Sequence, residues 1–432
     1  NALEAASLIM VPSGYENGTL ASVKPNDGTG DFTFSRGSNL SATRINEQGY
    51  IEKGYENLFL QSNSFDTTWQ PASLNTPVSG QSGYDESTDA WLVESQVAFG
   101  QLYQNISASG VVSFSLYAKA GTCESVNLTI NGSLSVTGVF FLTGAGSSSP
   151  SSSSAFTAIE RVGTSDWYRC TITYNNSSIT RVRIIPSDGS GSAFAGTLYI
   201  QDAMLNQGLV AYPYIETTTA PVAGGILEDM PRLDWASGAP SLLLEPSRTN
   251  LINYSEPFEA SGTPNWRTQN GTIVLSDEKP YFLNTYAAKY VPTSTGFNQI
   301  FITLTSLSVG SSYVNTYYLK PSSGISYLFF DVGGRIKYNV STNALDPLPV
   351  GVSGGITQLQ DGWLKATFIY DSVSSSINTN KVYASITDNF TSGIPLNEYL
   401  LFTACQFEQG SYPTSYIPTY GVSQTRLRDS AD

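Results

Sequence analysis

The sequence predicts an all-β protein made of two tandem jelly-roll β-sandwiches joined by short strand-like connectors. Three observations predict this fold class. Charged residues are only 13% of the 432 residues, and Ser, Thr, Asn, 38 Gly and 26 Tyr take their place, a composition that favours sheets and turns. Several stretches alternate apolar and polar residues with the period of a strand, and none shows a helical period. The chain also carries a long internal repeat.

The repeat indicates a duplicated domain. The stretch YENLFLQSNSFDTTW in the first half is answered by RTNLINYSEPFEASGTPNW in the second, and both copies close with similar strands. The matched positions are collinear and lie 193 to 202 residues apart, as expected for two copies that differ in loop length. The anchors shared by the copies are Asn57, Trp69 and Trp167 in the first, and Asn250, Trp266 and Trp363 in the second.

Each segment then has an expected place along the chain. Within the first copy, Val112, Phe114, Leu116 and Ala118 alternate with polar residues and predict a strand with one buried face. The Ser- and Gly-rich residues 144–154 predict a flexible surface loop. The segments outside the copies are too short to be domains, so we expect them to pack on the sandwiches or on neighbouring subunits. The predicted parts are an N-terminal segment 1–54, jelly roll 55–217, connector 218–247, jelly roll 248–421 and tail 422–432.

The repeated anchors are expected to stabilise the fold. A residue that recurs at one position in two different sequences is most simply explained by packing, although a buried tryptophan and a sugar-stacking tryptophan look alike in sequence. We therefore expect truncation of Trp167 to cost about 3–5 kcal/mol, the usual range for a core tryptophan. Asn57 and Asn250 are expected to hold a turn or strand end by hydrogen bonds.

Composition excludes several functions. The chain has no histidine, so His-based triads and the common zinc sites are excluded. A net charge of −14 argues against nucleic acid or anionic membrane as partners, and no apolar run approaches the roughly 18 residues that span a bilayer. The three cysteines, Cys123, Cys170 and Cys405, lie in strand-like flanks and are expected to be small buried hydrophobes.

The candidate binding residues are those that differ between the copies. Tyr84, Asp85, Glu86 and Trp91 lie in one loop-like stretch, where rings could stack on a sugar while carboxylates hold its hydroxyls. The alternative is a solvated acidic loop with Trp91 tucked into the sandwich. As an exposed loop residue, Tyr84 should cost less than about 0.5 kcal/mol when truncated.

Metal binding and catalysis have weaker support in the sequence. Calcium requires clustered oxygen ligands, and Asp89 and Asp202 are the calcium candidates, although no D-x-D-x-D-G loop is present. Glycoside hydrolysis needs two carboxylates, but the acidic pairs of this chain are adjacent in sequence and are most simply solvated charges. We expect no catalytic residue and no obligatory cofactor.

The segments around the second copy resemble a known pattern. FTFSRGSNLSATRINEQGYIE, PRLDWASGAPSLLLEPSRTNLINYSEPF and the close QFEQGSYPTSYIPTYGVSQTRLRDSAD are similar to segments of structural proteins of tailed bacteriophages and prophages, including phages of Bacteroidetes hosts. In that family these segments flank a jelly roll resembling carbohydrate-binding modules. In the simplest members the first segment leads almost directly into the second, so residues 55–217 resemble an inserted repeat.

The resemblance implies a place in the virion, as a fibre, spike or decorating appendage at the particle surface. It implies other virion proteins as partners, a homo-oligomer that is most simply a trimer, and adhesion to host surface glycans through many weak contacts. Two alternatives stay open: a purely structural head or tail component that binds only virion proteins, and a secreted bacterial carbohydrate-binding adhesin.

Overall fold

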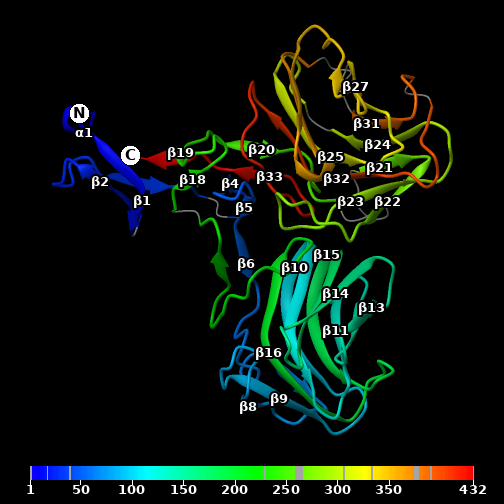
Figure 1. Ribbon diagram of the computed structural model, residues 1–432. Coiled ribbons are helices and arrows are strands. Elements are labelled where there is room, and N and C mark those ends of the chain that lie inside the picture. The colour runs from blue at the N-terminus through cyan, green and yellow to red at the C-terminus, as the bar shows by residue number, and fades with distance from the viewer. Residues whose placement is uncertain are drawn as a thin grey trace. The chain divides into compact units, whose positions relative to one another are not determined.

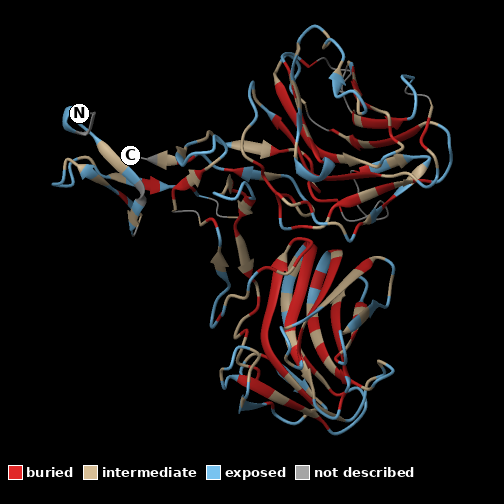
Figure 2. Cartoon of the chain, viewed as in Figure 1, coloured by how far each residue is buried: buried red, intermediate tan, exposed pale blue. Residues whose placement is uncertain are grey.

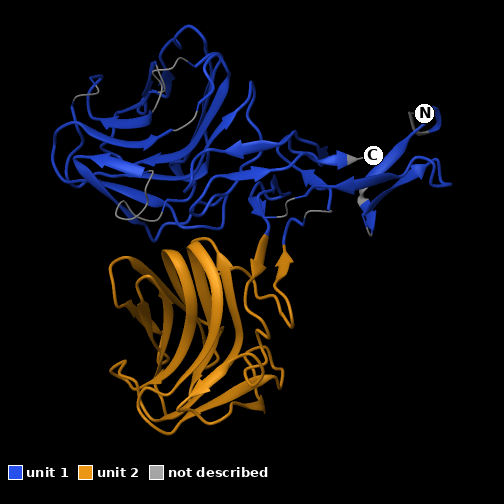
Figure 3. Cartoon of the chain, turned by 180° about the vertical axis from the view of Figure 1, so that it is seen from behind, with its two compact units in different colours: residues 1–54, 225–432 blue, residues 55–224 orange. Residues whose placement is uncertain are grey.

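The protein consists of two compact units (Figure 3). We call residues 55–224, drawn orange, the first unit because they hold the first sandwich, and residues 1–54 together with 225–432, drawn blue, the second unit. It is all-β, as predicted: the described residues contain many strands, one four-residue helix α1 (Ala2–Ala5) and one 3-10 turn (Gln360–Gly362). The first unit extends beyond the predicted boundary at 217, because β17 (Val222–Gly224) pairs with β6 (Tyr55–Asn57). The computed structural model describes residues 2–16, 18–37, 40–227, 230–257, 266–304, 307–331, 334–373, 379–389 and 392–431.

The first sandwich is built around two long strands that run through both of its layers (Figure 1). One layer has the order β8-β9-β16-β10-β15-β14, and the other has the order β7-β10-β15-β11-β12-β13. The strands are β7 Gln70–Ala72, β8 Val78–Gln81, β9 Ala90–Ser95, β10 Gln101–Ala120, β11 Ser125–Gly132, β12 Val136–Phe141, β13 Ser147–Pro150, β14 Ala155–Arg161, β15 Trp167–Ser187 and β16 Gly196–Gln207.

The second sandwich has two separate six-stranded sheets. Their orders are β22-β23-β32-β25-β30-β29 and β21-β24-β31-β26-β27-β28. The strands are β21 Trp266–Gln269, β22 Gly271–Leu275, β23 Ala288–Pro292, β24 Asn298–Thr303, β25 Tyr313–Pro321, β26 Tyr327–Asp331, β27 Arg335–Asn339, β28 Ala344–Leu345, β29 Val352–Gln358, β30 Leu364–Tyr370, β31 Thr379–Ser385 and β32 Leu400–Gln409.

The two sandwiches have the same strand order, which confirms the duplication predicted from the repeat. Strands β8, β9, β16 and β14 correspond to β22, β23, β32 and β29. The long strand β10 corresponds to β24 followed by β25, and the long strand β15 to β30 followed by β31. In the second copy, each long strand is thus interrupted where it passes from one sheet to the other.

The repeated asparagines make the same buried bonds in both copies. Asn57 donates from Nδ2 to the carbonyl oxygens of Ala203 and Ile215, at 3.1 and 2.9 Å. Its Oδ1 accepts two backbone N–H groups, so the amide ties the start of the sandwich to its last strand. Asn250 makes the four equivalent bonds with Cys405, Ile417, Ile252 and Phe407.

The repeated tryptophans of the first motif also match. Trp69 donates from Nε1 to the carbonyl of Gln61, and Trp266 donates to the carbonyl of Tyr254, four residues after the respective asparagine. Both rings are buried. These contacts fix how the chain enters each sandwich.

The predicted inward side of β10 is buried in the core: Val112, Phe114, Leu116 and Ala118 are fully buried. The prediction of one buried face was wrong at Ser113 and Ser115, which are also buried, because the chain after β16 covers this part of the sheet and Ser113 bonds to Gly208. Buried residues are drawn red in Figure 2. The three cysteines are buried and unpaired. The prediction of a flexible loop over residues 144–154 was wrong in part, because Ser147–Pro150 forms β13 and pairs with β12. Serine is tolerated there because β13 is an edge strand with mostly exposed side chains.

The short segments outside the sandwiches form small antiparallel sheets within the second unit. The first and last segments of the chain meet where β3 pairs with β34, and the C-terminal β33 pairs with β20 at the start of the second sandwich. The bounds are β1 Ile9–Glu16, β2 Thr19–Lys24, β3 Phe32–Ser35, β4 Thr43–Ile45, β5 Ile51–Lys53, β18 Arg232–Asp234, β19 Ser241–Leu243, β20 Arg248–Asn250, β33 Gln424–Arg426 and β34 Ser430–Ala431.

Candidate functional site

One outer sheet face of the first sandwich gathers aromatic and charged side chains. Along β10, Leu116 and Ala118 point into the core, so Tyr117 and Lys119 point to the opposite face. Neighbouring strands add residues in register with these two on either side. We call this the aromatic face, and it comprises Tyr84, Tyr117, Lys119, Trp167, Arg169, Tyr199 and Gln201.

Tyr84 lies against this face. Its ring stacks on Tyr117 with centroids 3.7 Å apart and planes 9° apart, and its edge meets Trp167 at 6.4 Å. Its hydroxyl donates to Asp202 Oδ2 at 2.9 Å, and its backbone N–H donates to Gln201 Oε1 at 3.0 Å. Burial, with the Asp202 carboxylate beside it, raises the pKa of Tyr84, so the phenol stays a donor. Tyr84 is therefore half-buried and anchored, not a free loop residue.

Asp202 sits at a bulge in β16. Its φ of 56° lies in the left-handed region, and the pairing of β10 with β16 shifts register between Ser115 and Tyr117. The side chain is almost fully buried. Burial, together with the nearby carboxylates of Asp89 and Asp85, raises the pKa of Asp202 to about 7, against the opposing hydrogen bond from Tyr84.

The acidic loop after Tyr84 is tied to the same face. Asp85 Oδ1 accepts Ser87 Oγ at 2.7 Å and Gln201 Nε2 at 3.1 Å, and Asp89 Oδ1 accepts Gln201 Nε2 at 2.7 Å. Glu86 is exposed at the tip of the loop. Among the described residues, no group of three or more acidic or cysteine side chains is placed to hold a metal ion, so the calcium candidates Asp89 and Asp202 gain no support.

Trp91 is placed differently from the sugar-stacking hypothesis. Its ring is buried on β9, where it meets Phe65 edge-on at 6.1 Å, and Nε1 donates to the carbonyl of Asn63 at 2.9 Å. The alternative interpretation, a tryptophan tucked into the sandwich, describes this placement. Strand alternation turns Trp91 inward, which the loop-like sequence around it did not reveal.

The second sandwich carries the same face with different chemistry. Phe282 stacks on Tyr318 at 4.5 Å and meets Trp363 edge-on at 5.4 Å, so Phe282 takes the place of Tyr84. This cluster is covered by the chain itself. Ile51 on β5 packs into it and donates its N–H to the carbonyl of Phe282, while Lys53 makes a buried ion pair with Glu256 at 2.7 Å.

Four equivalent positions differ in polarity between the two faces. The buried apolar residues of the covered face have polar counterparts on the first sandwich, where Asp85 is exposed, Tyr84 and Tyr199 are half-buried and Asp202 is buried. Tyr199 and Leu401 pair with equivalent lysines, and Asp202 and Ala404 share the left-handed bulge. The matched pairs are Tyr84 with Phe282, Asp85 with Leu283, Tyr199 with Leu401, and Asp202 with Ala404. The first face is thus built to meet water or a polar ligand.

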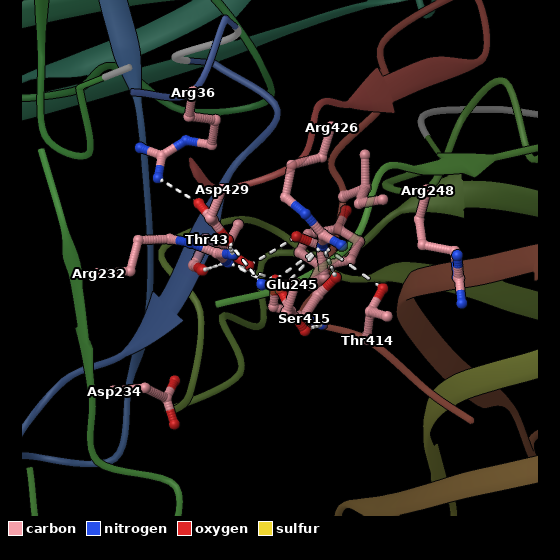
Figure 4. A network of polar contacts seen from close by, with 12 residues as sticks. Arg36, Thr43, Arg232, Asp234, Glu245, Arg248, Thr414, Ser415, Arg426 and Asp429 are labelled. Atoms are coloured by element: carbon pink, nitrogen blue, oxygen red, sulfur yellow. Dashed lines mark hydrogen bonds and ion pairs between the residues drawn. The ribbon is translucent and has the colours of Figure 1, made fainter. Parts of the chain in front are cut away.

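A second polar centre lies inside the unit that holds the second sandwich (Figure 4). Asp429 accepts Arg36 at 2.9 Å and pairs with Arg232, and Glu245 pairs with Arg232 at 2.9 Å and Arg426 at 3.1 Å. The three guanidinium groups and the Asp429 carboxylate are fully buried. This cluster, the arginine junction, joins segments from both ends of the chain.

The residues of the arginine junction lie in the segments quoted above, where the sequence alone indicated no role for them. Arg36 lies in FTFSRGS, Arg232 in PRLD, Glu245 in LLLEP, and Arg426 and Asp429 in TRLRDSAD. Each segment contributes a charged residue, and that shared feature could have indicated that they meet. Since Arg36, Arg232 and Arg426 pair with Asp429 and Glu245, the cluster acts as a clasp that holds these segments together.

Comparisons with known proteins found only distant structural matches. No protein-family model matches the chain, and no curated protein does. A solved tandem of two CBM22 domains from Xyn10C of Paenibacillus barcinonensis is 10% identical, with a TM-score of 0.26, covering 87% of this chain and 100% of that one. Salicylate 1,2-dioxygenase from Pseudoaminobacter salicylatoxidans is 9% identical, with a TM-score of 0.10, covering 74% and 70%. Among the described residues, no helix is long and apolar enough to cross a membrane.

The protein is an all-β chain of two duplicated sandwiches. The same outer face is covered by the chain itself in the second sandwich and is polar in the first.

The buried Asp202 gives a direct test of that polar face. Its pKa is about 7 in the folded protein against 3.8 ordinarily, so the folded state holds a proton that the unfolded state has released between about pH 4 and 7. The free energy of unfolding of the first unit should therefore fall by about a few kcal/mol as the pH rises through this window, and it should stay at the lower value above pH 7.

Asp202→Asn should remove this dependence, since asparagine tolerates the left-handed backbone and can accept the Tyr84 hydroxyl. The measurement is denaturant unfolding of wild type and variant at pH 4 to 8. Asp202→Asn should be the more stable of the two at pH 8, and parallel pH profiles for the two proteins would show that the Asp202 pKa is ordinary.

Proposed function

We propose that this chain is a virion structural protein of a tailed bacteriophage, a fibre, spike or decorating appendage, whose first sandwich binds host surface glycans without catalysis. The binding role is supported by one observation above all: the aromatic face is polar in the first sandwich and apolar where residues of β5 cover it in the second. The virion role is supported by the resemblance of the segments that form the arginine junction to segments of bacteriophage structural proteins.

The aromatic face has the chemistry that sugars need. Half-exposed rings such as Tyr199 offer a flat apolar surface to the C–H face of a sugar ring, and carboxylate and amide groups beside it accept and donate to hydroxyls. Asp85, Asp89 and Gln201 already lie in one hydrogen-bonded set, which fixes their directions before a ligand arrives.

The contact area of such a face is small, so a single site should bind weakly. We propose that the chain works as a homo-oligomer, most simply a trimer, in which several first sandwiches engage one cell surface together. Ser87, Gln201 and Tyr84 donate hydrogen bonds to the carboxylates near the face. These bonds hold the carboxylates in place, which favours a role in binding over a role in catalysis.

Tyr199→Ala should weaken glycan binding about tenfold, equivalent to a lost contact worth about 1.4 kcal/mol. The measurement is a glycan array on wild type, followed by calorimetric titration of the best ligand. The matched control is Tyr50→Ala, an exposed tyrosine of the other unit. Titration should give one site per chain, because the equivalent face of the second sandwich is closed by Ile51.

Two outcomes would favour the alternatives. If wild type binds no glycan but captures another virion protein through the aromatic face, the purely structural function is supported. If it binds glycans but is encoded apart from capsid and tail genes, the secreted bacterial adhesin is supported.

A further inference from the structure

Lys119 occupies the centre of the aromatic face. Its ammonium lies 5.3 Å from the ring centroid of Tyr199 and 6.0 Å from that of Trp167, so it sits between two rings. Beside it, the Arg169 guanidinium lies 5.5 Å from the centroid of Tyr117. Two cations thus lie on neighbouring strands of one face, in a chain whose 35 acidic residues outnumber its 21 lysines and arginines.

In the second sandwich, where the equivalent face is covered, the lysine at this position has an acidic partner. Lys320, the equivalent of Lys119, pairs with Glu278 at 2.6 Å. Glu278 lies on the connection between β22 and Phe282, which spans residues 276–281. In the first sandwich the matching connection, between β8 and Tyr84, is only Ser82 and Gly83.

The shorter connection leaves no counterpart of Glu278. Within the described part of the first unit, the ion pairs include no acidic partner for Lys119. Arg169 lies beside Lys119: its Nη2 donates to the carbonyl of Tyr212, while its buried Nε has no hydrogen-bond partner among the described residues.

We propose that the glycan bound by the first sandwich carries an anionic group, and that Lys119 is the residue that pairs with it. This inference rests on the proposed glycan binding and specifies its ligand class: an acidic saccharide that carries either a carboxylate or a sulfate ester. The sugar ring lies against Tyr199, and Asp85 and Asp89 on the far side of Gln201 accept its hydroxyls. Opposite charges on the two sides fix the direction in which the ligand lies.

The net charge of the protein does not oppose this binding at physiological salt. The Debye length at physiological salt is about 8 Å, so salt screens the carboxylates elsewhere on the surface. The electrostatic attraction of an anion to this face therefore depends mainly on the nearby ammonium of Lys119. Aromatic rings on two sides of Lys119 exclude water from its flanks, which strengthens a contact between ammonium and anion.

The experiment titrates wild type with three oligosaccharides of one backbone: the neutral form, a form with one uronic acid, and a form with one sulfate ester. Wild type should bind at least one charged form about tenfold more tightly than the neutral form, and added salt should weaken only the charged form. The uronate and sulfate arms distinguish the two sources of the anion.

Variants then assign the effect to Lys119. Lys119→Gln should bind the charged and neutral forms equally, and Lys119→Arg should keep the preference. Lys320→Gln is the matched control, because it removes the equivalent lysine of the closed face, and it should bind as wild type does. A melting curve for each variant confirms that the first unit is folded.

The results separate this inference from the proposed function. Neutral binding that depends on Tyr199, with no preference for charge or no effect of Lys119→Gln, overturns the anionic ligand and keeps glycan binding. No binding to any sugar of the panel or of a broad array overturns both.

Discussion

Replacing Asp429 by Ala should destabilise the unit that holds the second sandwich by about 3–5 kcal/mol, the cost of breaking a buried ion pair by removing one partner. The carboxylate pairs with Arg36 and Arg232 and accepts the backbone N–H of Glu245. Without it, the fully buried Arg36 guanidinium loses this ion pair, and Arg232 loses one of its two carboxylate partners and keeps Glu245. Denaturant unfolding should show the loss in the transition of this unit, with the first sandwich unfolding as before.

The matched control is Asp166→Ala, which removes a surface ion pair with Arg161 at 3.3 Å. Exposed pairs of this kind contribute about 0–1 kcal/mol, so this variant should unfold almost as wild type does. If Asp429→Ala were as stable as Asp166→Ala, the arginine junction would not be the clasp that joins the ends of the chain.

Trp167→Ala should destabilise the first sandwich by about 3–5 kcal/mol, as large-to-small changes at buried aromatic positions do. Trp167 is only 4% exposed, although it lies on the aromatic face, because Tyr84 packs against its edge and Lys119 lies over its ring. Unfolding monitored by tryptophan fluorescence and circular dichroism gives the measurement. Trp363→Ala should have the same effect on the second sandwich, where Phe282 takes the place of Tyr84.

A different result would exchange the roles of these residues. If Trp167→Ala melted at the wild-type temperature but no longer bound glycan or adsorbed to host cells, Trp167 would be the stacking platform. The structure also changes the expectation for Tyr84. Its stack on Tyr117 and its bond to Asp202 mean that truncation should cost more than the 0.5 kcal/mol expected for an exposed loop residue.

Local patterns predicted the strands and their inward faces because a strand has a period of two. Val112 and Phe114 alternate with serines, and both are buried. The collinear repeat predicted that both copies share one topology, and the strand orders agree. Local patterns failed where the placement of a side chain depends on packing between a loop and the sandwich. Trp91 was assigned to a loop and lies inside the sandwich. Tyr84 was considered specific to the first copy, but Phe282 takes the same place in the second.

The sequence by itself determined that this is an all-β protein with two duplicated sandwiches, anchored by Asn57 and Asn250. Only the tertiary structure decided what covers the outer face of each sandwich. The alternation within a strand predicts which side chains point away from the core, but the segment that covers those side chains is distant in the sequence. Ile51 closes the second face across more than two hundred residues, and Asp429 joins both ends. Such contacts depend on three-dimensional proximity, which strand periodicity does not encode.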